Sequence, residues 1–128
     1  MNSSRRFLAM GALSGFVSVA LGAFAAHGLR SVLAPDMLAT FETAARYQMY
    51  HSFALMITGL VMERSPVENL RRFNIAGWCF AIGTLLFCGS LYLLALLQER
   101  WIAAITPVGG AGFLAGWFFL AFSTVRRK

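Results

Sequence analysis

Three long runs without a charged side chain dominate this sequence and restrict the folds open to it. Residues 7–29, 73–98 and 101–125 each span at least 23 positions that carry no formal charge. An α-helix needs about 20 mostly apolar residues to cross a bilayer. Hydrophobic residues make up 59% of the chain and charged residues only 12%, which is unlike an ordinary soluble domain. The sequence therefore predicts an integral membrane protein with three helical spans.

A fourth span is expected between the first two of these runs. Residues 47–62 carry no formal charge, but they supply only about 24 Å of helix at ~1.5 Å per residue. This stretch crosses only if residues 44–46 enter the interface. Pro35 and Asp36 suit the first turn of a helix, which would then run to residue 62. Alternatively, residues 34–45 form a separate interfacial helix that bends into the span.

We therefore expect one all-α domain over residues 1–128, an integral membrane four-helix bundle. Its helices are predicted at about residues 7–28, 36–62, 73–97 and 101–125. Most basic residues lie at the termini and in the middle loop, namely Arg5, Arg6, Arg64, Arg71, Arg72, Arg126, Arg127 and Lys128. Short cytoplasmic loops retain Lys and Arg, so the N-terminus and C-terminus are predicted to be cytoplasmic, in a multi-pass membrane protein.

The net charge of +6 follows from this topology and does not indicate nucleic-acid binding. The basic residues form no stripe interleaved with exposed aromatic residues, so no nucleic-acid partner is expected, and membrane lipid is the expected partner. Arg5 and Arg6 before an apolar run, with an Ala-x-Ala at residues 23–25, also resemble a secretory signal. That run is longer than the 7 to 15 residues of a typical signal core, so we expect it to be retained.

A polar cassette interrupts the second predicted helix. Glu42 and Arg46 are spaced i, i+4 with the acid first, the better orientation for a helical ion pair, and Tyr47 and His51 form a second such pair. The topology places most polar residues in the outer half of the membrane, whereas Ser14 falls in the inner half. The candidate ligand-binding or ion-pair residues are His27, Glu42, Arg46, Tyr47, Tyr50, His51, Tyr92 and Thr106.

Two interpretations of this cluster stay open. The side chains would line a pocket for a headgroup or small metabolite, or relay a proton through His51 and Glu42. Alternatively, Glu42 and Arg46 neutralise one another at the interface, the tyrosines belong to the aromatic belt, and His51 hydrogen-bonds a neighbouring helix.

Small residues indicate close helix packing. Gly11 and Gly15 are spaced i, i+4, as are Gly112 and Gly116, and such pairs permit either contact within the bundle or a homo-oligomer. Pro107, followed by two glycines, predicts a kink or brief unwinding about a turn and a half into the last helix. Cys79 and Cys88 are nine residues apart on one helix, on opposite faces, and are not expected to pair.

Catalytic signatures are missing from the sequence. It contains no Walker loop, GxGxxG, nucleophile elbow or HExxH, and two histidines without grouped thiolates fall short of a usual metal-ligand set. We expect no enzyme activity, no cofactor and no metal site. The expected function is binding of a lipid headgroup, a small ligand or a partner helix at the polar cluster. The alternative is a small transporter or a proton-coupled permease subunit.

Several motifs together resemble one family. They are GAFAAHGL at residues 22–29, FETAARYQMYH at 41–51, GSLYL at 89–93, and TPVGG at 106–110 followed by Gly116 and Trp117. Their order and spacing are similar to those of the YgdD-like family of small bacterial inner-membrane proteins, a group with a domain of unknown function and eukaryotic relatives. Ala25 stands where many members have glycine. The resemblance implies a four-helix integral membrane protein and carries no activity or catalytic residues.

Overall fold

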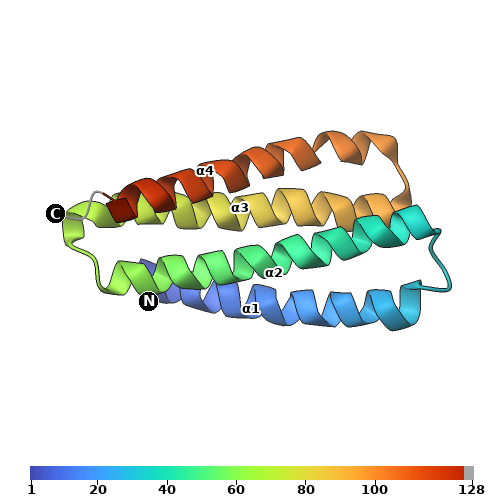
Figure 1. Ribbon diagram of the computed structural model, residues 1–128, viewed down its shortest axis with the longest axis horizontal. Helices are drawn as coiled ribbons and strands as arrows, with labels where there is room; N and C mark the ends of the chain where they lie inside the picture. Colours follow the sequence, from blue (N-terminus) through green and yellow to red (C-terminus); the bar gives the residue numbers. More distant parts are fainter. Residues whose placement is uncertain (126–128) are drawn as a thin grey trace.

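The computed structural model describes residues 1–125, and these are almost entirely helical (Figure 1). The four long helices are α1 (Ser3–Phe24), α2 (Pro35–Glu63), α3 (Val67–Leu97) and α4 (Thr106–Val125). A π-helical segment, η1 (Ala25–Leu29), extends α1, and a 3-10 segment, η2 (Arg100–Ala104), precedes α4. The all-α prediction is confirmed, with four long helices in the expected order.

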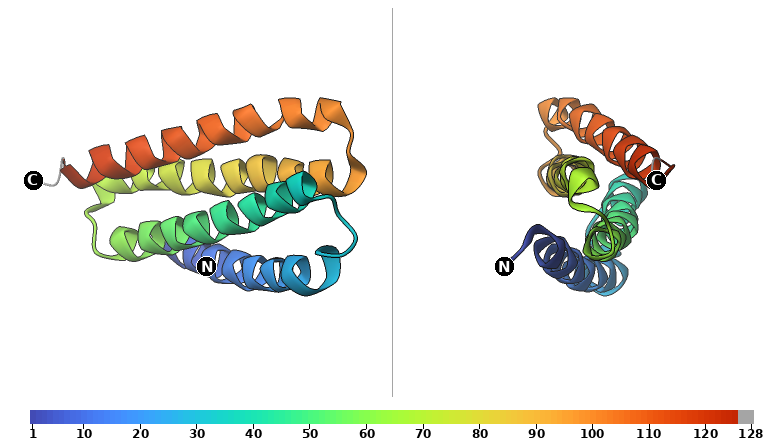
Figure 2. Two further views of the ribbon diagram at one scale, coloured as in Figure 1. Left: turned by 45° about the vertical axis from the view of Figure 1, so that its right-hand side comes forward. Right: turned by 90° about the vertical axis from the view of Figure 1, so that its left-hand side faces the viewer.

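The helices pack in chain order, each against the next and in the opposite direction (Figure 1). Viewed end-on, they form a staggered row in which α1 and α4 lie at opposite edges (Figure 2). Glycines hold the outer pairs together: Gly11 lies against Ser52 of α2, and Gly109 lies against Phe87 of α3. Because the tightest contacts join consecutive helices, the four helices form an open row, and the four-helix bundle stays a prediction.

Three helices begin earlier than the uncharged runs suggested. α1 starts at Ser3, where the Asn2 side chain caps it by accepting a hydrogen bond from the Arg5 N–H at 3.0 Å. α2 runs without a break from Pro35, so no separate interfacial helix forms at residues 34–45. α3 starts at Val67 directly after Pro66. Charged residues end the apolar runs but do not end the helices, because Arg and Glu are good helix formers.

Three helical stretches within residues 1–125 are long and apolar enough to cross a membrane: Ser3–Leu29, Val67–Leu97 and Arg100–Val125. α2 has 29 residues, or about 44 Å at ~1.5 Å per residue, but it is more polar and is not among the three. Its position between α1 and α3 supports the predicted fourth crossing (Figure 1).

One end of the row collects most of the basic residues that the structure describes. The start of α1, the connection from α2 to α3 and the last turn of α4 all lie at this end (Figure 1). We call it the basic end, after Arg5, Arg6, Arg64, Arg71 and Arg72. The topology prediction also used Arg126, Arg127 and Lys128, which lie outside the described residues. The connections at residues 30–34 and 98–99 lie at the opposite end, which we call the far end.

The glycine pairs face other helices of the same chain. A Cβ on Gly11 would lie 2.7 Å from the Ser52 carbonyl oxygen, and one on Gly116 would lie 2.7 Å from the Phe80 ring. A Cβ on Gly112 would lie 3.3 Å from the Gly83 Cα, and Gly15 has more room beside Ser52, at 3.8 Å. These contacts agree with the interpretation that the pairs pack within the chain, and a homo-oligomer stays a prediction.

The expected irregularity near Pro107 lies just before the proline. η2 ends at Ala104, Ile105 forms a turn, and α4 begins at Thr106. Pro107 therefore occupies the first turn of α4, where a missing N–H costs little, rather than a position a turn and a half inside a helix.

Candidate functional site

Gln48 connects three helices through its side-chain amide. Its Nε2 donates to the carbonyl oxygen of Ser14 at 3.2 Å and to the Ser14 hydroxyl at 3.3 Å, while its Oε1 accepts a hydrogen bond from the Tyr92 hydroxyl at 2.6 Å. The side chain is buried, so these partners satisfy donors and an acceptor that water cannot reach. Ser14 and Gln48 therefore lie at one depth, although the predicted topology assigned them to opposite halves of the membrane.

His51 links α2 to α4, and its hydrogen-bond partners determine which ring nitrogen carries the proton. Its Nδ1 lies 2.7 Å from the Tyr47 carbonyl oxygen, and its Nε2 lies 3.1 Å from the indole Nε1 of Trp117. A carbonyl oxygen only accepts and an indole N–H only donates, so Nδ1 carries the proton and Nε2 accepts. The ring also stacks on Phe113 with a centroid separation of 3.4 Å and an interplanar angle of 7°. His51 is thus a neutral, fully hydrogen-bonded side chain that packs two helices together.

An open groove with a volume of about 730 Å³ runs between α2 and α4, with α3 behind it. Most of its lining is aromatic or apolar. The residues are Tyr47, Tyr50, His51, Phe87, Pro107, Gly110, Ala111, Phe113, Leu114 and Trp117. The Tyr47 ring packs on Phe87 with a centroid separation of 5.0 Å and on Tyr50 at 5.7 Å. We call this feature the α2/α4 groove.

The two groove tyrosines keep their hydroxyl groups available. Tyr47 is 39% exposed and Tyr50 is 53% exposed, and within residues 1–125 neither hydroxyl makes a hydrogen bond. His51, by contrast, is 4% exposed and has both nitrogens occupied. The polar groups that the groove offers to a ligand are therefore two phenol hydroxyls on an apolar wall.

Glu42 and Arg46, whose pairing the sequence left open, form no ion pair with each other. The Arg46 Nη2 instead donates to the Thr43 hydroxyl at 3.2 Å, and the Glu42 carboxylate has no hydrogen bond or ion pair within the described part of the chain. Arg46 is exposed and Glu42 is half-buried. Neither residue lines the α2/α4 groove, although Arg46 precedes Tyr47 directly on the same helix.

The remaining candidates do not converge on one pocket. Tyr92 points to Gln48, whereas Thr106 lies 2.6 Å from the hydroxyl of Ser90 and joins α4 to α3. Ser90 and Tyr92 are two residues apart, about 200° around the helix at ~100° per residue, so they serve different faces of α3. His27 is exposed in η1 at the far end. Our expectation that these residues meet Glu42, Arg46 and His51 was wrong for this geometric reason.

Three aromatic groove residues were absent from our candidates: Phe87, Phe113 and Trp117. A phenylalanine or tryptophan in an apolar run carries no local signal that separates a groove wall from a lipid-facing side chain. The one available hint was Trp117, whose indole N–H needs an acceptor within a bilayer, where no water is present to supply one. That acceptor is the Nε2 of His51.

Thiols and metal ligands offer no alternative site in the described range. No group of three His, Cys, Asp or Glu side chains is close enough to hold a metal ion within residues 1–125. Cys79 is half-buried, Cys88 is buried, and both are free thiols, as their opposite faces predicted.

Comparison with known proteins places this architecture in a family. The model of the family described as "Protein of unknown function (DUF423)" matches residues 21–110, more than half of the chain. The chain belongs to the DUF423 family. The matched DUF423 region includes every candidate residue from His27 to Thr106, but it ends before Phe113 and Trp117.

Relatives of this DUF423 protein cover nearly its full length. It is 43% identical over 120 residues to the UPF0382 membrane protein of Staphylococcus haemolyticus, covering 94% of this chain and 95% of the relative. It is 43% identical over 123 residues to that of Haemophilus influenzae, covering 96% of each. It is also 39% identical over 132 residues to the UPF0382 inner membrane protein YgdD of Escherichia coli, covering 98% and 94%. The YgdD-like resemblance is therefore confirmed. No solved structure matches the chain.

Proposed function

We propose that this DUF423 protein is a multi-pass protein of the cell inner membrane that holds a membrane amphiphile in its α2/α4 groove and catalyses no reaction. The amphiphile has an apolar chain and a small hydrogen-bonding head. The observation that supports this function most directly is the apolar groove of about 730 Å³ with two unpartnered tyrosine hydroxyls.

The size and chemistry of the groove suit such a ligand. Binding sites for small molecules are typically ~300–1,000 Å³, mostly apolar, with a few placed polar groups. The wall built by Phe87, Phe113 and Trp117 would cover an acyl or isoprenoid chain. Tyr47 and Tyr50 would hydrogen-bond the head, since a phenol both donates and accepts.

The predicted topology indicates from which leaflet of the membrane the ligand would enter the α2/α4 groove. If both termini and the basic end are cytoplasmic, Tyr47 faces the outer half of the membrane about 18 Å along α2 from Pro35, at ~1.5 Å per residue. Arg46 is exposed beside it, and a long basic side chain can extend its charge toward the interface. It would attract a phosphate or carboxylate on the head of the ligand. The bound amphiphile would therefore come from the outer leaflet.

Native mass spectrometry of gently extracted protein, with a visible absorption spectrum, tests the proposal. Ala111 is exposed in the groove, so Ala111→Phe should fill it, whereas Ala12→Phe makes the same change on an exposed position of α1. We expect wild type and Ala12→Phe to retain one amphiphile and Ala111→Phe to lose it. An apo wild type, or equal retention in both variants, would refute the proposal.

The hydroxyl groups are tested separately by Tyr47→Phe and Tyr50→Phe. Each change removes one oxygen and leaves the aromatic wall in place, so the variants should fold and should retain less of the ligand. Retention that is unchanged in the double variant would show that the head of the ligand binds elsewhere.

The transporter alternative depends on a helix break that faces ionisable groups. Pro107 lies in the first turn of α4, and neither Glu42 nor Arg46 lines the groove that contains it. A small permease subunit would also need a second copy to build an alternating-access site. Cross-linking in native membranes that found only monomers would count heavily against this alternative.

A further inference from the structure

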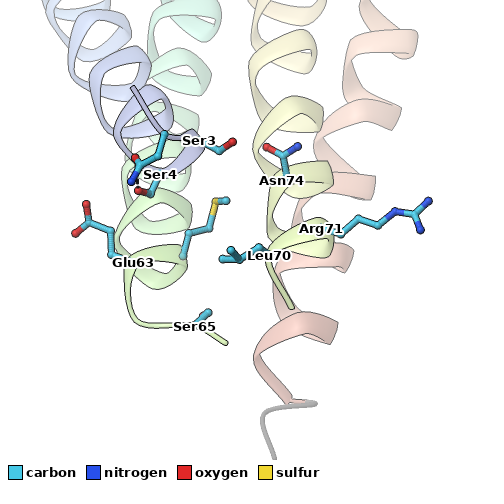
Figure 3. A pocket seen from close by; sticks show the side chains of 9 residues that line it. Ser3, Ser4, Glu63, Ser65, Leu70, Arg71 and Asn74 are labelled. Atoms are coloured by element: carbon cyan, nitrogen blue, oxygen red, sulfur yellow. Dashed lines mark hydrogen bonds between the residues drawn. The ribbon is translucent and has the colours of Figure 1, made fainter. Parts of the chain in front are cut away.

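A second hollow lies at the basic end, remote from the α2/α4 groove. This basic-end cavity has a volume of about 670 Å³ and lies among the first turn of α1, the last turn of α2 and the first turns of α3 (Figure 3). Its polar lining includes Ser3, Ser4, Ser65 and Asn74, and Met62 and Leu70 add apolar surface. The cavity therefore offers both polar groups and apolar surface.

Asn74 connects this cavity to two further spaces along α3. It lines a small cavity of about 80 Å³ together with Arg6 and Trp78. Asn74 and Trp78 also line a furrow of about 320 Å³ that continues to Ile82 and Gly112. Residues 74, 78 and 82 follow one another at i, i+4, so the three spaces share one face of α3.

The track changes from polar to apolar along its length. Hydroxyl and amide groups and the Arg6 guanidinium lie at the basic end, Trp78 comes next, and the furrow beyond it is almost wholly apolar. Tryptophan concentrates at membrane–water interfaces, where its ring meets both headgroup and hydrocarbon. The order matches that of a phospholipid from its headgroup to its acyl chain.

We propose that this track binds one glycerophospholipid of the leaflet at the basic end. The phosphodiester headgroup would occupy the basic-end cavity, with the Asn74 amide and the Ser3 hydroxyl as hydrogen-bond donors, because the hydroxyls of Ser4 and Ser65 already donate to Asn2 and to the Val61 carbonyl. Arg6, which lines the adjoining small cavity, would be the cation. One acyl chain would lie in the furrow against Trp78 and Ile82.

The charges at this end favour a phosphate over a neutral or cationic head. Glu63 lines the cavity, but its carboxylate extends away from the gap where Asn74 lies (Figure 3). Arg71 also extends outward, and it lies on an exposed, flexible side chain that can turn toward a bound anion (Figure 3). A free phosphate would use the polar cavity alone, whereas the adjoining apolar furrow gives a lipid further binding surface.

This site is independent of the proposed function because the track and the α2/α4 groove share no lining residue. The experiment uses the delipidated full chain in detergent, titrated with short-chain phosphatidylglycerol and followed by native mass spectrometry. Short-chain diacylglycerol, which lacks the phosphate, and inorganic phosphate, which lacks the chains, are the matched probes.

At this track we expect wild type to bind one phosphatidylglycerol at least tenfold more tightly than either probe, in addition to any amphiphile held in the α2/α4 groove. Asn74→Leu and Arg6→Gln should each weaken binding about tenfold, since hydrogen bonds to a charged group commonly contribute that much. Arg6 is exposed on the surface of α1, so Arg6→Gln should fold even if Asn74→Leu does not. Ala111→Phe, which fills the other groove, should bind normally.

Three results would overturn this proposal. They are equal affinity for diacylglycerol, equal affinity for inorganic phosphate, and unchanged binding in Arg6→Gln. Loss of phosphatidylglycerol in Ala111→Phe would also overturn it, because the lipid would then occupy the α2/α4 groove.

Discussion

Gly109 is the position where a single methyl group should do most damage to the contact between α3 and α4. A Cβ at this position would meet the backbone nitrogen of Phe87 and would lie 2.7 Å from its Cα, while real Cβ atoms essentially never approach closer than 3.0 Å. A helix backbone cannot rotate out of the way as a side chain can. Gly109→Ala would therefore force the two helices apart.

Opposing terms set the size of this effect. Alanine is intrinsically favoured over glycine in a helix interior by about 1 kcal/mol. Overpacking costs about 1–3 kcal/mol, and more when backbone must move. The separation would also stretch the 2.6 Å contact between Ser90 and Thr106 at the same end, and such an interhelical hydrogen bond contributes about 0.6 kcal/mol. We expect a net loss of about 1–3 kcal/mol for Gly109→Ala.

Gly89 provides the matched control. It lies on α3, and a Cβ there would meet nothing within 4 Å. Gly89→Ala should therefore gain about 0.5–1 kcal/mol from helix propensity alone. Unfolding by sodium dodecyl sulfate in mixed micelles, followed by circular dichroism, measures both free energies of unfolding. If Gly109→Ala were as stable as Gly89→Ala, the close approach of α3 and α4 would be refuted.

Further predictions address other contacts. A double-mutant cycle with Gln48→Met and Tyr92→Phe, measured by the same unfolding titration, should give a coupling energy of about 0.6 kcal/mol and at most ~1.7 kcal/mol. Zero coupling would contradict the 2.6 Å hydrogen bond between the two side chains. A lipid-permeant maleimide should label Cys79, which is half-buried beside the furrow, before the buried Cys88, and mass spectrometry of peptides will show the order. Asn2→Ala should cost about 1 kcal/mol and speed hydrogen exchange in the first turn of α1, whereas Asn2→Gly should cost only a few tenths.

The helices were predictable from the sequence because their signal is local. Length and hydropathy alone identify the spans at residues 7–29, 73–98 and 101–125, and Pro35 with Asp36 marks the start of α2. The open row was not predictable. A glycine such as Gly11 shows that something approaches closely, but it does not say which helix approaches or in which order the helices lie.

The site was predictable only in part, because helix rotation decides which polar groups meet. The i, i+4 spacing of Tyr47 and His51 correctly places both on the groove side of α2. We grouped Tyr92 and Thr106 with them only because all four were predicted at a similar depth in the membrane. Depth does not show that Tyr92 and the Ser90 partner of Thr106 lie on different faces of α3. The hydrogen bond between His51 and Trp117 joins residues 66 positions apart, which no local pattern can reveal.

The pattern of satisfied and unsatisfied groups favours amphiphile binding over proton relay. His51 accepts from Trp117 at Nε2 and donates to the Tyr47 carbonyl at Nδ1, so a second proton would place two donors, the imidazolium and the indole, face to face. Proton uptake at His51 would therefore require Trp117 to leave, and with it the contact between α2 and α4. An amphiphile needs no such rearrangement, because the groove is already open and the Tyr47 and Tyr50 hydroxyls already lack partners within the described chain. Of the two proposals that use this face, amphiphile binding is the one that leaves the packing of the helices intact.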